Sequence, residues 1–166
     1  LRAARGDRLL APGMLDSAYR TLSAQVDRRI GGFTGAPKFP QPMNLDFLLR
    51  YHHRSRQQEP LALAERTLQR MALGGIYDQL GGGFHRYSTD RIWLVPHFEK
   101  MLYDNAQLSR VYAEAYRVTG RPDYRRVAEG TYDWVLREMT GKEGAVYSTL
   151  DADSEGAEGK FYGWTP

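Results

Sequence analysis

Apolar residues recur at intervals of three and four along most of this chain, which is the period of one face of an α-helix. In the first such stretch one face carries Leu15, Tyr19, Leu22, Val26 and Ile30. Later stretches open with Asn or Pro and close with Gly, the usual start and stop residues of helices. The pattern therefore predicts five helices, over residues 15–30, 44–53, 60–73, 98–119 and from 122 to just before Gly141.

Two segments depart from the helical period and contain short runs of aromatic and β-branched residues. Phe84–Ser88 and Ile92–Val95 predict one β-hairpin. Ala145–Leu150 and Lys160–Trp164 predict a second hairpin around the acidic loop Asp151–Gly159. Because these strands are too few and too short for a parallel sheet, the expected fold class is mainly α, with helical hairpins and short β-hairpin insertions.

The composition excludes several classes of function. The 166 residues make up about one domain and can bury a core. The chain has no cysteine, which excludes disulfides, thiolate zinc sites and thiol catalysis within it, and we expect a cytoplasmic protein. No apolar run approaches the ~20 residues of a membrane span. The net charge of +3 is spread without a dense basic patch, so we expect neither a membrane nor a nucleic acid as partner.

The densest group of reactive side chains lies between Gly81 and Asn105, after three consecutive glycines that permit sharp turns. His85 and His97 can exchange protons near neutral pH, and a neighbouring carboxylate such as Glu99 can fix the tautomer of an imidazole. This segment is therefore the first place to expect proton-transfer chemistry. The alternative is that both histidines are satisfied loop residues and that Glu99 only caps the following helix.

Cationic and aromatic side chains around this segment are suited to holding a polar substrate. Arg86 and Lys38 can bind a hydroxyl, carboxylate or phosphate group, although each can instead pair with an acid of the protein. Tyr87, Trp93 and Tyr103 add aromatic faces. Together these residues predict a polar binding site rather than an ordinary core.

The segment Asp151–Gly156 begins like a calcium-binding loop, with acidic residues at its first, third and fifth positions. The twelfth position requires a bidentate Glu but is Tyr162, so we expect no metal site. Asp151 or Asp153 can instead face a histidine across a cavity for general acid–base work. The alternative is a solvated acidic turn. No glycine pattern leads to Lys-Ser or Lys-Thr as in a phosphate-binding loop, and we expect no cofactor.

Long motifs across nearly the whole chain resemble those of a known family. They are Gly32-Phe33, Ala36–Pro40, Gly74–Asp78, Gly81–Ser88, Trp93, Val95–Asp104, Asp151–Gly156, Phe161 and Trp164. In this order they closely resemble the thioredoxin-domain-containing proteins of the spermatogenesis-associated protein 20 type. Such proteins usually begin with a thioredoxin-like domain that bears a Cys pair, and this chain has neither. We expect the chain, which has no initiator Met, to be a piece of a longer protein of this kind.

The resemblance also implies a fold. The chain would be about the N-terminal half of an (α/α)6 toroid, similar to the N-acylglucosamine 2-epimerases and six-hairpin glycosidases, with residues 1–166 as a single fragment. The expected partners in the full-length protein are the remaining half of the toroid and the thioredoxin-like domain. Because a half toroid leaves apolar helix surface uncovered, we expect the chain on its own to self-associate.

The same resemblance implies a carbohydrate-active domain that binds a sugar or a related polyol. The leading hypothesis is epimerisation or isomerisation by proton abstraction beside a carbonyl, with His97 or His85 as acid/base and Glu99 or Asp151 assisting. The residues expected to contact the substrate are Lys38, Arg86, Tyr87, Trp93, Tyr103 and Asp153. Two alternatives stay open: hydrolysis with Asp151 or Glu99 as the acid, and a non-catalytic toroidal scaffold that binds a ligand or protein for the thioredoxin-like domain.

Overall fold

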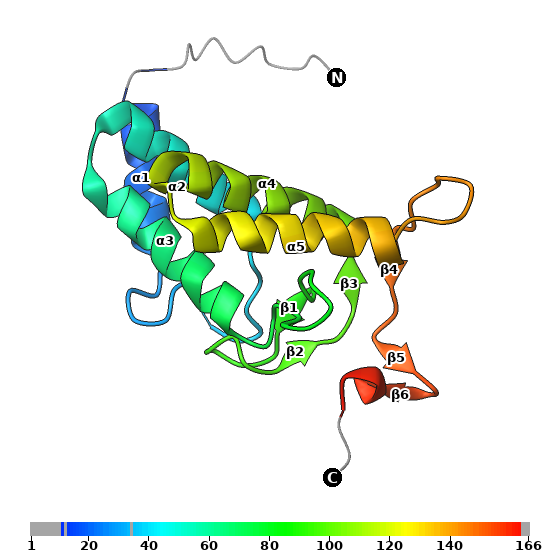
Figure 1. The fold of residues 1–166 in the computed structure, drawn as a ribbon. Coiled ribbons are helices and arrows are strands. Elements are labelled where there is room, and N and C mark those ends of the chain that lie inside the picture. Colours follow the sequence, from blue (N-terminus) through cyan, green and yellow to red (C-terminus); the bar gives the residue numbers. More distant parts are fainter. Residues whose placement is uncertain (1–10, 12, 34, 164–166) are drawn as a thin grey trace, which may run out of the picture.

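A computed structural model describes residues 11, 13–33 and 35–163. Its helices are α1 (Met14–Ser23), α2 (Pro42–Ser55), α3 (Gln58–Leu73), α4 (Leu102–Thr119) and α5 (Pro122–Glu138). Figure 1 shows these helices together on one side of the molecule, with the strands and long loops gathered on the other. The mainly helical fold class is thus confirmed, and the candidate site lies on the side of the loops.

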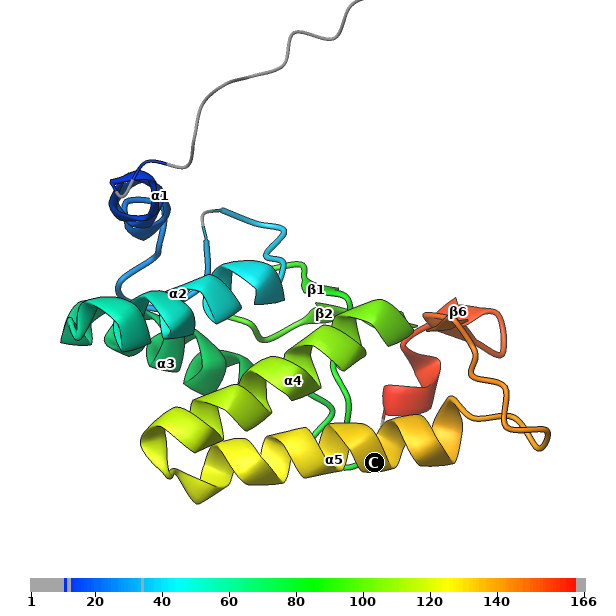
Figure 2. The same cartoon turned by 90° about the horizontal axis from the view of Figure 1, so that it is seen from above.

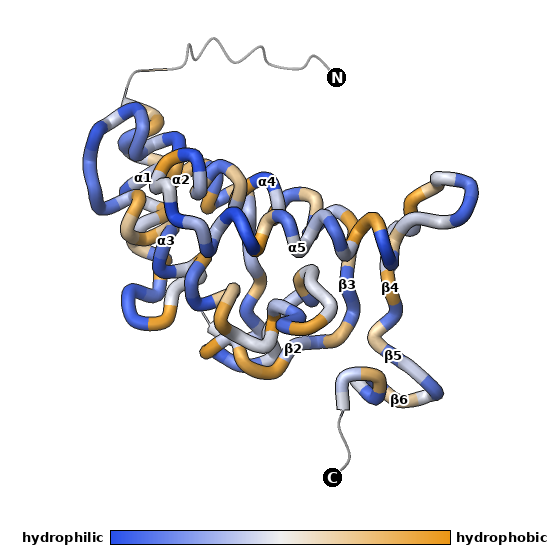
Figure 3. Tube along the Cα trace, viewed as in Figure 1, coloured by the Kyte–Doolittle hydropathy of each residue, from blue (hydrophilic) through white to orange (hydrophobic). Residues whose placement is uncertain are grey.

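The helices pack mostly against their neighbours in sequence, and α2 also packs against α4. Helix α5 lies along α4, α2 contacts both α3 and α4, and α1 contacts α2. Figure 2 shows α4 and α5 side by side and α1 at the far edge, next to α2. The buried core between them is built mainly from the apolar positions of α2, α3 and α4: Leu45, Leu48, Leu49, Leu68, Met71, Leu108, Val111, Tyr112 and Ala115. Figure 3 shows hydrophobic and hydrophilic residues interspersed along α4 and α5, as expected when one face of each helix is buried.

The strands are all two residues long and form three antiparallel pairs. Strand β1 (Tyr87–Ser88) pairs with β2 (Pro96–His97), and β3 (Lys100–Met101) pairs with β4 (Thr149–Leu150). Strand β5 (Asp153–Ser154) forms a tight hairpin with β6 (Ala157–Glu158), and a 3-10 turn, η1 (Lys160–Tyr162), follows. The segment that contains His97 and Lys100 is therefore held by two different strand pairs.

The first predicted helix was too long at its C-terminal end. Helix α1 stops at Ser23, and the carboxylate of Asp27 accepts hydrogen bonds from the backbone N–H groups of Arg29 and Ile30. A side chain that satisfies backbone donors in this way stabilises a turn in place of a helix. Ile30 is still buried, so its apolar character indicated burial correctly but not helix.

The predicted start of the long helix was also wrong. Helix α4 begins at Leu102 rather than near Phe98, because the preceding backbone pairs across the chain instead. The carbonyl of Glu99 accepts a hydrogen bond from the N–H of Arg86 at 2.8 Å, and Lys100 is paired with Leu150. As a result, His97 and Glu99 lie on extended backbone outside the helix.

Both predicted hairpins had wrong partners. The partner of β1 is β2 rather than Ile92–Val95, because the carboxylate of Asp90 accepts hydrogen bonds from three N–H groups of that run and folds it into a loop. In the second case, β4 pairs with β3, and Lys160–Tyr162 is a 3-10 turn. Trp164 lies outside the described residues.

Candidate functional site

The segment from Pro96 to Met101 is the centre of the site. Strand β2 places His97 opposite Tyr87, and their rings stack with centroids 4.9 Å apart. Strand β3 directs Lys100 to the other side, where it is buried. Since successive side chains of an extended segment point in opposite directions, this short stretch supplies functional groups to two neighbouring regions.

The first region is a group of four charged or titratable side chains, which we call the His97 cluster: Arg86, His97, Glu99 and Glu158. Nδ1 of His97 lies 2.7 Å from Oε1 of Glu158, and its Nε2 lies 3.7 Å from Oε2 of Glu99. Arg86 donates from Nη1 to the same Oε2 of Glu99 at 2.8 Å. Two of the predicted catalytic residues, His97 and Glu99, are therefore brought together, and Arg86 is ion-paired with one of them.

His85 lies next to this cluster but is buried. Asn105 on α4 accepts a hydrogen bond from the backbone N–H of Phe84 at 2.6 Å and donates to its carbonyl at 2.9 Å, which fixes the backbone just before His85. Nδ1 of His85 lies 3.0 Å from the carbonyl oxygen of Phe98. Burial, together with the charge of Lys100, lowers the pKa of His85 to about 4. The ring is therefore neutral at pH 7, with its proton on Nδ1, and Nε2 carries a lone pair.

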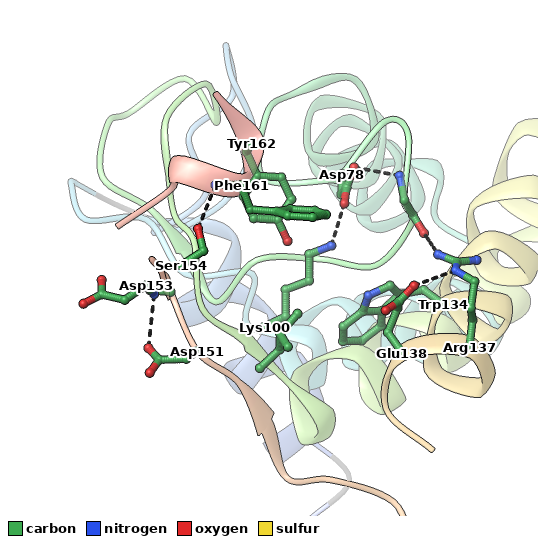
Figure 4. Close-up of a pocket in the computed structure, with 13 residues that line it drawn as sticks. Asp78, Lys100, Trp134, Arg137, Glu138, Asp151, Asp153, Ser154, Phe161 and Tyr162 are labelled. Carbon is green, nitrogen blue, oxygen red and sulfur yellow. Dashed lines mark hydrogen bonds and ion pairs between the residues drawn. The ribbon is translucent and has the colours of Figure 1, made fainter. Parts of the chain in front are cut away.

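The second region is a cavity of about 300 Å³ that we call the Lys100 pocket (Figure 4). Lys100 donates from Nζ to Oδ2 of Asp78 at 2.8 Å and to the carbonyl of Gly82 at 2.9 Å. The same ammonium lies 5.0 Å from the ring centroid of Trp134 and 5.4 Å from that of Tyr162. Burial lowers the pKa of Lys100, and the hydrogen bond that Lys100 donates to Asp78 opposes that shift. The ammonium is thus paired with Asp78 and lies against two aromatic rings.

Asp151 and Asp153 line the rim of this pocket. Both are exposed, and Oδ1 of Asp151 accepts a hydrogen bond from the backbone N–H of Asp153 at 3.2 Å. Figure 4 shows both carboxylates on the side of the pocket away from the Lys100 ammonium. The structure thus places Asp151 beside the Lys100 pocket, and among the described residues its carboxylate forms no hydrogen bond or ion pair with the His97 cluster.

The Phe98 and Tyr162 rings lie beside the two regions, because Phe98 follows His97 in the chain and Tyr162 lines the Lys100 pocket. They stack with centroids 5.2 Å apart, and the His85 ring meets both of them edge-on. A wider hollow of about 780 Å³ is lined by His85, Phe98 and Tyr162 and shares Asp78 with the Lys100 pocket. Sugars and other polyols bind well to such surfaces, which combine aromatic faces with hydrogen-bonding groups.

Lys38 and Trp93 are fully buried and line neither of these cavities. Nζ of Lys38 donates to the carbonyls of Gly31 and Arg91, and lies 5.2 Å from the Trp93 ring centroid. The indole Nε1 donates to the carbonyl of Ile30. These contacts connect the turn after α1 to the loop after β1. Both side chains therefore have structural roles in the folded chain.

Tyr103 and Asp104 occupy the first turn of α4. Tyr103 is half exposed, whereas Asp104 is buried, and burial raises the pKa of Asp104 to about 6 against the opposing charge of Arg86. Nε of Arg86 is also buried and has no hydrogen-bond partner among the described residues. Buried polar groups that are incompletely paired are characteristic of functional sites.

Sequence reasoning missed Asp78, Asp104, Trp134, Glu158 and Tyr162 as site residues. Asp78 lies within the Gly74–Asp78 motif, which was the only signal pointing to it. Among the described residues no group of three or more His, Asp or Glu side chains is arranged to hold a metal ion. Within the same residues, none of the helices combines the length and apolar character needed to cross a bilayer.

Comparison with known proteins agrees with the motifs and with the fold. Spermatogenesis-associated protein 20 from Mus musculus is 46% identical over 173 residues, which cover 96% of this chain and 22% of the mouse protein. This chain is a close homologue of one segment of spermatogenesis-associated protein 20. It spans about a fifth of the length of the curated relatives it matches. No protein-family model matches it. A cellobiose 2-epimerase from Bacteroides fragilis is 32% identical over 79 residues, or 47% of the chain and 20% of the enzyme.

Solved structures identify the architecture of this spermatogenesis-associated protein 20 homologue. A sugar epimerase from a ruminal bacterium superposes with a TM-score of 0.72 at 17% identity, over 80% of this chain and 36% of the epimerase. A family 76 glycoside hydrolase (mannosidase) from Bacteroides thetaiotaomicron gives a TM-score of 0.65 at 16% identity, over 81% and 38% of the two chains. These neighbours are (α/α)6 toroids, so the helices described here have the fold of part of such a toroid, as the sequence motifs implied.

Proposed function

We propose that this chain contributes the first helices of a carbohydrate-active (α/α)6 toroid, and that the remaining helices of the full-length protein complete its site. Support comes from the coverage of 36% of the sugar epimerase neighbour and from curated relatives that are several times longer. A thioredoxin-like domain would be attached elsewhere in the full-length protein. In this view the loop side that carries the His97 cluster forms one wall of a larger pocket.

The proposed reaction is epimerisation or isomerisation of a sugar by proton transfer beside a carbonyl group. The observation that carries it is the setting of His97, whose imidazole is stacked on Tyr87 and has one nitrogen hydrogen-bonded to Glu158 at 2.7 Å. A general base needs a titratable group with a fixed tautomer and access to the substrate. The His97 side chain is 25% exposed and meets this requirement, whereas the buried His85 is better suited to line the pocket.

Other residues would have supporting roles. Arg86, ion-paired with Glu99, presents a cation with which a sugar hydroxyl or a developing enolate oxygen can interact. Tyr87 and Tyr103 offer phenol groups near the same cluster, and Asp153 with Asp151 would contact hydroxyls at the rim of the Lys100 pocket. Lys38 and Trp93 are left out of this proposal because they are buried in structural contacts.

Hydrolysis of a glycosidic bond is the second candidate, and the observation that favours it is Asp104. A glycosidase needs one carboxylic acid that keeps its proton near neutral pH. Burial raises the pKa of Asp104 to about 6, so this side chain keeps its proton to a higher pH than an ordinary aspartate does, whereas Asp151 is exposed. Release of free sugar would distinguish hydrolysis from isomerisation. Loss of that release in an Asp104→Asn variant would support Asp104 as the acid.

The proposal is tested by incubating the full-length protein with a panel of aldoses, ketoses and disaccharides and following the products by NMR. We expect one sugar to be converted into its C2 epimer or its ketose isomer, and a His97→Asn variant to lose conversion by a factor of about 10²–10⁴, the usual contribution of a general acid–base group. His53→Asn is the matched control, because His53 is exposed on α2 far along the chain from this cluster. Conversion that is equally fast in both variants would refute the role of His97.

A further inference from the structure

The two nitrogens of the His97 ring have different surroundings. Nδ1 lies 2.7 Å from Oε1 of Glu158, which is a short hydrogen bond, whereas Nε2 lies 3.7 Å from Oε2 of Glu99, which is beyond hydrogen-bond distance. Oε2 of Glu99 is already occupied by Nη1 of Arg86 at 2.8 Å. Within the described part of the chain, Glu99 therefore does not accept a proton from Nε2, and Glu158 is the one acceptor for a proton on the ring.

Glu158 is itself fixed in place. Its Oε1 also accepts a hydrogen bond from the backbone N–H of Phe98 at 3.3 Å, so one carboxylate oxygen spans two consecutive residues of the His97 segment. The hydrogen bond from His97 lowers the pKa of Glu158, which keeps this group ionised and therefore an acceptor only. The proton between the two side chains must then belong to Nδ1 of His97.

The β5–β6 hairpin delivers Glu158 to this position. Asp153 pairs with Glu158 across the hairpin, and the N–H of Gly159 donates to the carbonyl of Ala152 at 3.0 Å. Gly159 has φ +71°, and a Cβ added there would lie 2.5 Å from the Phe98 ring. The backbone after Glu158 thus packs directly on Phe98, in a conformation that favours glycine. This close approach explains why an otherwise exposed acidic loop is held against the site.

We propose that Glu158 is a positioning residue for His97: it selects the Nδ1–H tautomer and leaves Nε2 free to take a proton from the substrate. The inference rests on the proposed function for its catalytic consequence, but its structural part concerns the ring alone. The charged and titratable groups around His97 include Glu158 from β6, Glu99 from its own segment, Arg86 and the stacked Tyr87, with the neutral His85 nearby. Among the residues that the structure describes, Glu158 alone contacts a His97 ring nitrogen within hydrogen-bond distance.

The tautomer can be measured without knowing the substrate. In the ¹⁵N-labelled 166-residue chain at about pH 8, long-range ¹H–¹⁵N spectra distinguish a protonated from an unprotonated ring nitrogen. We expect His97 to be protonated on Nδ1 in the wild type. In Glu158→Ala and Glu158→Leu, which replace the carboxylate by a small and a large apolar side chain, the ring should shift toward the Nε2–H form. Glu158→Gln retains an acceptor oxygen and should keep the Nδ1–H form.

Glu155→Ala is the matched control, because Glu155 lies on the same hairpin with its side chain 76% exposed and pairs only with Lys160 among the described residues. It should leave the His97 spectrum unchanged. An Nε2–H tautomer in the wild type, or an Nδ1–H tautomer that persists in both Glu158→Ala and Glu158→Leu, would overturn the proposal.

Activity of the full-length protein gives a second, separable readout. We expect Glu158→Ala to lower kcat about tenfold or more with little change in KM, because the substrate still binds while fewer rings carry the lone pair on Nε2. If the tautomer changes as expected but no sugar is converted by the wild type, the positioning role of Glu158 stands and the proposed function fails. If sugar is converted but the tautomer of His97 does not change in the Glu158 variants, the positioning role of Glu158 is wrong and the proposed function stands.

Discussion

The ammonium nitrogen of Lys100 lies 2.8 Å from Oδ2 of Asp78, which is 22 residues earlier in the chain. Both side chains are largely buried, and the pair fastens the glycine-rich loop after α3 to the start of α4. The carboxylate of Asp78 also accepts hydrogen bonds from the N–H groups of Leu80 and Gly81. This pair therefore lines the Lys100 pocket and fixes the conformation of the glycine-rich loop after α3.

Removing the cation from this pair should destabilise the chain strongly. Lys100→Met leaves the Asp78 carboxylate buried without its counter-ion, and breaking a buried pair in this way typically costs about 3–5 kcal/mol in the free energy of unfolding. Arg125→Met is the control, because the Arg125–Glu129 pair is exposed to solvent and should contribute far less to stability. Urea denaturation measures both, and equal losses for the two variants would contradict the buried-pair account.

The glycine-rich loop should tolerate a methyl group poorly at Gly83. A Cβ there would lie 2.7 Å from two atoms of the Trp134 ring, whereas at Gly120 no atom lies within 4 Å, and both residues have φ above +70°. Gly120→Ala therefore measures the backbone strain alone, and Gly83→Ala adds the overlap with Trp134. We expect Gly83→Ala to lower the free energy of unfolding by about 1–3 kcal/mol more than Gly120→Ala does. Thermal and urea unfolding of the two variants would show whether this difference exists.

Burial of His85 should make the chain less stable in acid. The pKa of His85 is about 4 in the folded chain against 6.5 for an ordinary histidine, so the unfolded chain binds the proton more tightly. Stability therefore falls as the pH drops from about 6.5 to 4, by at most about 3 kcal/mol. In His85→Asn the amide can still donate to the carbonyl of Phe98 but cannot titrate. In the variant, the free energy of unfolding should no longer show the fall between pH 6.5 and 4 that is due to His85. A pH dependence equal to that of the wild type would contradict the lowered pKa of His85.

Asp104 should have the opposite effect on the pH dependence of the free energy of unfolding. Its pKa is about 6 in the folded chain against 3.8 for an ordinary aspartate, so the folded chain binds this proton more tightly. Stability contributed by the protonated form is lost as the pH rises from about 3.8 to 6, by at most about 3 kcal/mol. Asp104→Asn should therefore gain stability relative to the wild type between pH 4 and 7 and match its trend below pH 4. A constant difference between the two at every pH would show that Asp104 is not perturbed.

The extent of agreement between sequence and structure follows from the range of the interactions involved. Helices α3 and α5 match their predicted ranges closely because their starts are marked by Pro60 and Pro122 and their apolar positions are local. The ends of α1 and the start of α4 differ because Asp27 and the backbone of Glu99 find partners outside the helical period. Hydropathy spacing contains no information about such competing hydrogen bonds.

The site shows the same division. His97, Glu99 and Arg86 were identified because they are close together in a segment rich in reactive side chains, and they do form one cluster. Glu158 and Asp78 were missed because their partners are 61 and 22 residues away, and the pairing depends on how a hairpin and a loop dock. Motif resemblance pointed to the segments, but only the folded chain pairs the side chains.

The central claim is that His97 transfers a proton at a carbon atom beside a sugar carbonyl, and solvent deuterium tests it most directly. The full-length protein is incubated with the sugar that it converts in D₂O, and the sugar is analysed by mass spectrometry and NMR. We expect one deuterium at the carbon that receives the proton, which is C2 of an epimer or aldose product and C1 of a ketose product, with labelling lost in His97→Asn and retained in His53→Asn. Conversion without deuterium at that carbon, or labelling that is unaffected by His97→Asn, would contradict the claim.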